Sequence, residues 1–253
     1  MDRIKRQDIL NYFKTHYIAH RGLFDNSKNA PENTILAFKR AVEAGYGIEL
    51  DIQLSLDKQA VVAHDYTIKR ICSDDKYIKD LSYQELCRYR IMNSVETIPL
   101  LNDVLKVIDG KVPLIVDIKT EGEYKEICRL TAKILSSYKG IYCIESFSPY
   151  VVGWFKRNCP DVIRGQLADD FLYNKYFKSS LKNWILTNMV HNTIFKPDFI
   201  AYNHQFSSKK CLGLWKKILG CTLAAWTVKT QAELDQAAKV FDIIIFDSFI
   251  PKI

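Results

Sequence analysis

The amino-acid sequence predicts an α/β protein with the (β/α)8 barrel fold, and two observations carry this prediction. Eight short runs of apolar and β-branched residues alternate with longer amphipathic stretches, which is the pattern of parallel strands joined by helices. The chain has 253 residues, a length that suits one large domain and that single barrels often reach. We therefore expect one barrel domain over residues 1–253.

The eight runs are expected to be strands of a parallel sheet, and their number favours a closed barrel. They lie at Tyr17–His20, Ile48–Leu54, Leu114–Lys119, Ile141–Phe147, Val162–Leu167, Phe199–Tyr202, Leu223–Val228 and Ile243–Phe246.

The amphipathic stretches predict helices, and local signals mark where some of them begin. Pro31 lies in the first turn of one, and Glu32 places an acid near the positive end of its dipole. Thr230 and Glu233 have the spacing of a capping box. The expected helices are Glu32–Ala44, Tyr124–Ser137, Pro149–Asn158, Lys209–Leu219 and Gln231–Lys239.

Residues 66–97 interrupt this alternation. The segment is polar and carries one short helical pattern, at Ser82–Arg90, so we interpret it as an insertion at the rim of the barrel. The sequence stops soon after the eighth strand, so an N-terminal helix at Arg3–Lys14 is expected to cover part of the barrel.

Composition limits the classes of function. Apolar residues make up 48% of the chain, enough for a sizeable core, and charged residues make up an ordinary 26%. The net charge of +7 suits an anionic substrate or surface. No block of Lys and Arg is dense enough for a nucleic-acid-binding arm, so we expect no nucleic-acid partner.

The cysteines and the termini indicate a compartment. Seven cysteines, odd in number, widely spaced and without a C-x-x-C pair, predict reduced and mostly buried thiols. The N-terminal residues are charged throughout and lack the apolar run of a signal peptide. The longest apolar stretch, Phe241–Phe246, is far too short to span a bilayer. We expect a cytoplasmic protein without an integral membrane segment.

Three carboxylates suggest a metal site. Glu49 and Asp51 are two positions apart on a predicted strand and therefore point to the same face. On its own such a pair is better interpreted as two solvated acids on an edge strand. Asp117, at the end of another strand, adds a third carboxylate, and carboxylates this close repel unless a cation neutralises them. Lys119 follows two positions later, either as a partner for phosphate oxygens or as a structural ion pair with Asp117. The three acids would keep it protonated, which argues against a Schiff base.

Two of the five histidines are each followed by a charged residue and lie where a barrel enzyme would place its active site. His20 precedes Arg21, and His64 precedes Asp65, each at the carboxyl end of an apolar run, where barrel enzymes place their catalytic residues. One such histidine is usually structural, but two with an arginine and a carboxylate cluster suggest an acid/base pair. The remaining histidines, His16, His191 and His204, lack such company, although His204 also follows a strand.

The order of these motifs resembles the glycerophosphodiester phosphodiesterase family. The match begins with His20-Arg21-Gly22, Ala30-Pro31-Glu32-Asn33-Thr34, Glu49-Leu50-Asp51-Ile52-Gln53-Leu54-Ser55 and Val61-Val62-Ala63-His64-Asp65. It continues through Ile98-Pro99-Leu100, Asp117-Ile118-Lys119, Ser146-Phe147-Ser148 and Trp226-Thr227-Val228, and so spans nearly the whole chain.

The resemblance implies a TIM barrel with a small insertion after the second strand unit, where residues 66–97 lie. It also implies magnesium or calcium held by residues that match Glu49, Asp51 and Asp117. Asp117 departs from the glutamate common in the family. Two further positions depart from the family pattern. Glu145 stands where the family often has glutamine. Asp247 is followed by Ser248 but lacks the proline that the family has two positions after this aspartate.

For catalysis, the resemblance implies His20 and His64 as the acid/base pair and Arg21 and Lys119 as phosphate ligands, with Trp226 walling the alcohol side of the pocket. It implies that the glycerol hydroxyl attacks first and that water then opens the cyclic phosphate. The products would be glycerol 3-phosphate and an alcohol such as choline or ethanolamine, a reaction of lipid and glycerol metabolism.

Two other functions remain open at this stage. A related phospholipase-type lyase would stop at the cyclic phosphate, and the Arg21 and Lys119 pattern favours the hydrolase. A non-catalytic barrel would bind phosphodiesters without cleaving them, and the presence of His20 and His64 argues against it. The preferred head group and the oligomeric state have no signature in the sequence.

Overall fold

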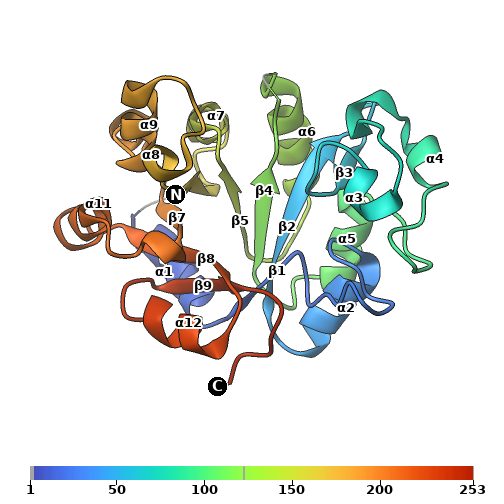
Figure 1. The fold of residues 1–253 in the computed structure, drawn as a ribbon, viewed down its shortest axis with the longest axis horizontal. Helices are drawn as coiled ribbons and strands as arrows, with labels where there is room; N and C mark the ends of the chain where they lie inside the picture. Colours follow the sequence, from blue (N-terminus) through green and yellow to red (C-terminus); the bar gives the residue numbers. More distant parts are fainter. Residues whose placement is uncertain (1–2, 122, 253) are drawn as a thin grey trace. The chain divides into compact units, whose positions relative to one another are not determined.

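The computed structural model describes residues 3–121 and 123–252, and these fall into two compact units. One unit comprises residues 18–142, and the other joins the N-terminal segment up to Tyr17 to the chain from Cys143 onward. Strands and helices alternate in both units (Figure 1). All eight predicted strands are present, within one or two residues of their expected ends.

In the first unit, β2 (Gly47–Leu54) lies between two parallel neighbours, β1 (Ile18–His20) and β4 (Leu114–Ile118). The register places His20 beside Glu49 and Asp51 beside Asp117. A short strand that we did not predict, β3 (Ala60–Val62), pairs antiparallel with the end of β2.

The sequence of β2 explains its central position. Ile48, Leu50 and Ile52 alternate along the strand and are fully buried, so one face is apolar. The other face carries Glu49 and Asp51, which are also buried. A strand buried on both faces is typical of parallel sheets, and here one of its faces is reserved for polar side chains.

The longer helices described in this unit are α2 (Ile35–Glu43), α5 (Leu101–Ile108) and α6 (Lys125–Leu135). The predicted start of α2 at Glu32 was three residues too early, because the Thr34 hydroxyl caps the helix by accepting a hydrogen bond from the Ala37 amide at 3.3 Å. We did not predict α5, although its buried residues have clear helical spacing. They are Leu101, Val104, Leu105 and Ile108.

Residues 66–97 form the expected insertion, with α3 (Lys69–Cys72), η1 (Ile78–Asp80) and α4 (Tyr83–Leu86). The predicted helix Ser82–Arg90 is shorter than expected and ends at Leu86. Ser82 and Glu85 cap it reciprocally. The segment is less polar than we inferred, because isolated aliphatic side chains gather into a small core together with β3. They include Ile68, Ile71, Ile78, Leu86, Ile91 and Ile98.

In the second unit, five parallel strands pair in sequence order. They are β5 (Tyr142–Ser146), β6 (Ile163–Ala168), β7 (Phe199–Asn203), β8 (Thr222–Val228) and β9 (Ile243–Phe246). The predicted helices near 149 and 231 are α7 (Pro149–Asn158) and α12 (Gln231–Ala237).

Other helical segments of this unit differ from expectation. The predicted helix Lys209–Leu219 is divided into α11 (Lys210–Gly213) and the π-helical segment η3 (Leu214–Ile218). Between β6 and β7 lie three short helices that we did not predict, and a 3-10 turn follows β7. These are α8 (Phe171–Asn174), α9 (Ser180–Thr187), α10 (Asn192–Phe195) and η2 (His204–Phe206).

The predicted N-terminal helix is α1 (Arg3–Lys14), and it packs against β9 through its buried side. Leu10 and Phe13 lie in the core, and Arg6 forms an ion pair with Asp198 at 2.9 Å, just before β7. Among the described residues, no helix is long and apolar enough to cross a membrane. The seven cysteines, all within the described ranges, form no disulfide, and Cys128, Cys143 and Cys211 are buried.

Candidate active site

The ends of β1 and β4 and the middle of β2, which lies between them, bring three carboxylates and a histidine together. The register puts Glu49 beside His20 and Asp51 beside Asp117. One oxygen of each of Glu49, Asp51 and Asp117 lies within 4.8 Å of the others. All three side chains are buried, so their charges must be neutralised locally.

Two cations of the chain neutralise part of this charge. Lys119 Nζ lies 2.9 Å from Asp51 Oδ1 and forms a second ion pair with Asp117. Arg21 Nε lies 3.4 Å from the other Asp51 oxygen. The ion pair between Lys119 and Asp117, which the sequence left open as the alternative to phosphate binding, is therefore present, and Lys119 also pairs with Asp51.

The pKa values of these groups follow from burial and their neighbours. Burial alone would raise the pKa of Asp51, but Lys119, His64 and Arg21 together hold it below its usual value. Burial and the charge of Asp51 raise the pKa of Asp117, against the influence of Lys119. Burial disfavours the Lys119 ammonium, yet the two aspartates raise its pKa, so it stays protonated and is no amine nucleophile.

A tight turn after β1 positions Arg21. Its backbone has a φ of 58°, and that of Gly22 is 83°. A Cβ on Gly22 would lie 2.9 Å from the carbonyl carbon of Ala37, so only glycine fits against α2. The Arg21 amide donates to Glu49 at 3.1 Å, and its guanidinium donates to Glu32 at 2.6 Å. Glu32, which the sequence suggested as an acid in the first turn of a helix, therefore orients the Arg21 guanidinium.

Glu32 is also held by a residue that the sequence analysis missed. Arg70, in α3, donates to both Glu32 oxygens at 2.7 Å and to Asp65 at 2.6 Å. Burial would raise the pKa of Glu32, but hydrogen bonds from Arg70 and the charge of Arg21 lower it to about 2. Arg70, which belongs to the insertion, thus links two carboxylates: Glu32, the partner of Arg21, and Asp65, the residue after His64.

His64 and His20 differ in their surroundings. Nδ1 of His64 lies 2.6 Å from Asp65 Oδ1, and because an ionised carboxylate only accepts, Nδ1 carries the hydrogen. Nε2 of His20 lies 4.0 Å from Glu49, and the side chain is 16% exposed, against 34% for His64.

A second missed residue, Asn33, belongs to the quoted motif but was considered only as a helix-start residue. It has a φ of 57°, and its side-chain amide donates to Asp51 at 2.8 Å. This hydrogen bond fixes the Asp51 carboxylate. The left-handed backbone conformation of Asn33 makes this hydrogen bond possible. The only sign of that conformation in the sequence is that asparagine tolerates it.

The carboxylate cluster fits a divalent cation. Buried Oδ1 of Asp117 has no hydrogen-bond partner within the part of the chain that is described, which is costly without a further ligand. Three carboxylates and no soft donor make a hard oxygen site of the kind that magnesium and calcium prefer.

The second unit holds Trp226 and the residues that depart from the family pattern. Trp226, in β8, packs edge-on against Phe147 with ring centroids 5.6 Å apart, and its buried Nε1 lacks a hydrogen-bond partner among the described residues. Glu145, on β5, is buried. Burial raises the pKa of the Cys143 thiol, and the charge of Glu145 raises it further. Asp247 accepts a hydrogen bond from the Ser248 hydroxyl at 2.7 Å.

The other three histidines have local contacts away from the carboxylate cluster: His204 lies 3.7 Å from Glu233, and His16 lies 3.0 Å from the Thr15 hydroxyl. His204 contacts the carbonyl of Thr227 at 3.1 Å, and His16 contacts that of Tyr12 at 3.0 Å. Burial lowers the pKa of His191 to about 4, so its ring is neutral.

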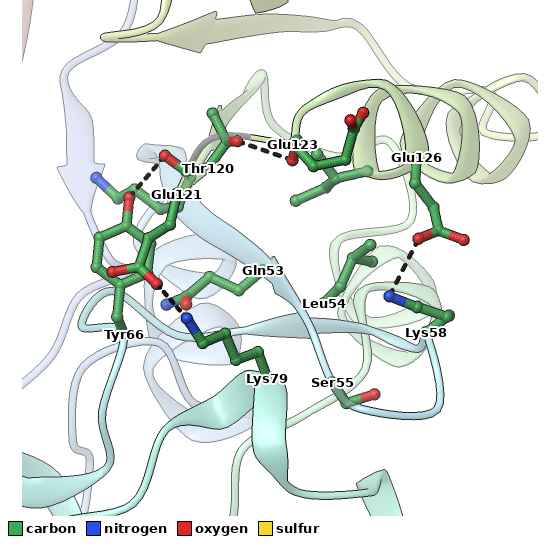
Figure 2. A pocket seen from close by; sticks show the side chains of 12 residues that line it. Gln53, Leu54, Ser55, Lys58, Tyr66, Lys79, Thr120, Glu121, Glu123 and Glu126 are labelled. Carbon is green, nitrogen blue, oxygen red and sulfur yellow. Dashed lines mark hydrogen bonds and ion pairs between the residues drawn. The ribbon is translucent and has the colours of Figure 1, made fainter.

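A cleft of about 190 Å³ adjoins Lys119, with Gln53, Tyr66 and the loop after β4 among its walls (Figure 2). Two ion pairs border it, Lys79 with Glu121 at 3.0 Å and Lys58 with Glu126 at 3.1 Å. Since these charges are already paired, the cleft has no evident preference for an anionic or a cationic group.

Comparison with known proteins identifies the family. The model of the family described as the glycerophosphoryl diester phosphodiesterase family matches residues 20–248. The chain belongs to this family. The resemblance inferred from the motifs is thereby confirmed, as is the enzyme class, a glycerophosphodiester phosphodiesterase.

Relatives and solved structures agree with this assignment. A glycerophosphodiester phosphodiesterase of Caldanaerobacter subterraneus subsp. tengcongensis is 35% identical over 166 residues, which cover 61% of this chain and 67% of the relative. The human glycerophosphodiester phosphodiesterase 1 is 29% identical over 85% of this chain and 72% of its own.

An Oleispira antarctica phosphodiesterase, solved in complex with the product sn-glycerol-3-phosphate, has a TM-score of 0.76 at 22% identity and covers 92% of both chains. A Thermotoga maritima glycerophosphodiester phosphodiesterase has a TM-score of 0.72 at 23% identity, covering 92% of this chain and 95% of its own. The predicted fold class, a (β/α)8 TIM barrel, is confirmed by this likeness.

Proposed function

We propose that this phosphodiesterase hydrolyses glycerophosphodiesters to glycerol 3-phosphate and an alcohol, with a magnesium or calcium ion. The observation that carries the proposal is the cluster of Glu49, Asp51 and Asp117 with His20 at its edge. The Oleispira antarctica neighbour, which holds sn-glycerol-3-phosphate, supports the choice of product.

Glu49, Asp51 and Asp117 would hold the cation, whose chemistry is to withdraw charge from phosphoryl oxygens as a Lewis acid. Asn33 keeps Asp51 oriented for this task through its amide hydrogen bond. Both magnesium and calcium accept such oxygen ligands, and the three carboxylates alone do not discriminate between them.

Arg21 and Lys119 bind the phosphate in this proposal. Both already stand beside Asp51, and both stay protonated because the surrounding carboxylates raise their pKa values. Fixed positive charge beside phosphoryl oxygens stabilises the charge that develops on them in the transition state.

His20 and His64 exchange protons with the two alcohols. The glycerol hydroxyl next to the phosphoester attacks phosphorus and releases the head-group alcohol, and water then opens the resulting cyclic phosphate. One histidine accepts the proton of the attacking hydroxyl while the other protonates the departing alkoxide. His64, held by Asp65 through Nδ1, is oriented to exchange the proton at Nε2.

Trp226 is proposed to wall the alcohol side of the pocket. Its indole Nε1 is buried and lacks a hydrogen-bond partner among the described residues, so a substrate oxygen would satisfy it. Phe147 supports the ring edge-on.

The test is release of glycerol 3-phosphate from a panel of glycerophosphodiesters, before and after chelation, with magnesium or calcium added back. We expect activity to vanish with chelator and to return with metal. His20→Ala and His64→Ala should each lower turnover by roughly 10²–10⁴-fold with the fold intact. Full activity in excess chelator, with no bound metal by elemental analysis, would refute the metal-dependent reaction.

The same assay separates the two alternatives. A lyase would accumulate the cyclic phosphate, which phosphorus NMR distinguishes from glycerol 3-phosphate. A non-catalytic barrel would bind the diester and leave it intact.

We also propose a cytoplasmic location, which the thiols support because none of them is in a disulfide. We further propose that residues 1–253 act as one barrel domain.

A further inference from the structure

The connection between β6 and β7 has its apolar and polar residues in an unusual arrangement. Residues 172–182 are all exposed, and several are large and apolar. Tyr173 is 73% exposed, Leu181 is 67% exposed and Trp184, one turn after Leu181 on α9, is 49% exposed. Soluble proteins seldom gather so many large apolar side chains on one surface without a partner.

Polar residues occupy the buried side of the same connection. Asn183 is buried and bonds to the backbone of Phe177 in both directions, at 3.1 and 2.8 Å. Buried Thr187 accepts a hydrogen bond from the amide of Leu172 at 3.1 Å. These bonds fix α8 and α9 side by side (Figure 1). The usual pattern of a surface helix is thus reversed, with polar groups inside and apolar groups outside.

The charge of this connection is one-sided between its two ends. Its three aspartates lie at those ends: Asp169 and Asp170 are buried, and Asp198 is paired with Arg6. Residues 171–197 contain four lysines and no aspartate or glutamate. In the structure as described, Lys175, Lys178 and Lys182 form no ion pair with a carboxylate, and Lys182 instead lies over the ring of Phe177 at 3.5 Å from its centroid. By contrast, other exposed lysines, such as Lys58 and Lys79, are each paired with a carboxylate.

We propose that this surface docks on a membrane rich in anionic lipids. The docking surface consists of the apolar Leu172, Tyr173, Tyr176, Phe177, Leu181 and Trp184 with the three unpaired lysines among them. Aromatic and leucine side chains bury in the boundary between head groups and acyl chains, while lysines reach the phosphates. The unopposed positive charge selects an anionic lipid surface over a neutral protein partner.

This inference is independent of the proposed chemistry. The surface is a βα connection, the class of segment that in barrel enzymes surrounds the catalytic face. Docking through it would hold the enzyme at a lipid surface without a membrane-spanning segment.

The test is co-sedimentation of the whole chain with phosphatidylcholine vesicles, with and without phosphatidylglycerol. We expect binding to the anionic vesicles that weakens with salt. The variant Lys175→Glu, Lys178→Glu, Lys182→Glu should lose binding by at least about 100-fold. The matched variant Lys39→Glu, Lys133→Glu, Lys239→Glu has the same net charge of +1, down from +7 in the natural chain, and should retain most of the binding.

The apolar half of the surface is tested separately. Leu181→Asp with Trp184→Asp should abolish binding, whereas Val95→Asp with Leu219→Asp, at positions elsewhere that are somewhat more exposed, should not. Trp184 emission should shift to the blue on addition of anionic vesicles, and Trp184→Phe should lack that component of the shift. Circular dichroism confirms that each variant is folded.

Several outcomes would overturn the proposal. These are equal binding to neutral and anionic vesicles, equal loss in the two lysine variants, or no binding at low salt. A natural chain that is dimeric in solution and becomes monomeric in the Leu181→Asp, Trp184→Asp variant, without vesicle binding, would assign the surface to a second copy of the chain instead.

Discussion

Asp65 holds His64 by a hydrogen bond of 2.6 Å to Nδ1, and Arg70 holds the other oxygen of the same carboxylate. His64 is therefore oriented by a residue that is oriented in turn from the insertion. This chain of contacts makes Asp65 a positioning residue for the proposed acid/base chemistry.

Asp65→Asn should lower kcat by about 10–100-fold with little change in KM, because asparagine no longer guarantees the Nδ1–H form of His64. Steady-state kinetics on a natural diester would measure this split. The matched control is Asp75→Asn, which removes an exposed carboxylate of the same insertion that pairs with Lys69. Equal kinetics for Asp65→Asn and the natural chain would show that the contact has no catalytic role.

Metal affinity should depend on residue 117. Asp117→Ala should weaken magnesium or calcium binding, because it removes one of the three clustered carboxylates. Asp117→Glu restores the residue common in the family and should be tolerated or bind more tightly. Calorimetric titration of the metal-free protein measures both affinities. If Asp117→Ala binds metal as well as the natural chain, Asp117 is no ligand and Glu145 becomes the next candidate.

Acid stability should depend on Glu32. Its pKa falls from the reference 4.5 to about 2 in the folded protein, so its contribution to stability is fully present above 4.5 and is lost as the pH falls toward 2. The contribution is about 3 kcal/mol at neutral pH. Glu32→Gln should therefore be less stable than the natural chain at pH 7, and the difference should shrink in acid. Urea unfolding at several pH values measures it, and a difference that does not vary with pH would contradict the assignment.

The reaction should require a free hydroxyl next to the phosphoester on glycerol. An internal nucleophile has a large effective concentration, so its loss should remove most of the rate. A 2-deoxy glycerophosphodiester should bind as an inhibitor and turn over poorly, while a cyclic glycerol phosphate should be hydrolysed. Comparable turnover of the deoxy analogue would indicate direct attack by water and exclude the two-step route.

The strands were predictable because each is marked by its own short apolar run, and because parallel strands end at a common edge. That edge brings Glu49, Asp51 and Asp117 together from two strands far apart in sequence. The start of α2 was misplaced because Pro31 and Glu32 resemble a first turn, whereas Thr34 provides the cap.

Contacts across long separations left no pattern to detect. Arg70 reaches Glu32 over 38 positions, and nothing near Arg70 distinguishes it from other surface arginines. The helices α8 and α9 escaped detection for another reason. With Asn183 and Thr187 buried and Leu181 exposed, their sequence lacks the inward apolar stripe from which amphipathic helices are identified.

The ion pairs of Lys119 have a consequence for the life of the enzyme without metal. The chain provides its own counterions to buried carboxylates, Lys119 and Arg21, so folding does not have to wait for a metal ion. We therefore expect the metal-free enzyme to stay folded and to become active when the ion is added. The variant Lys119→Met would lack one of these counterions, so it should need the metal ion for folding as well as for catalysis.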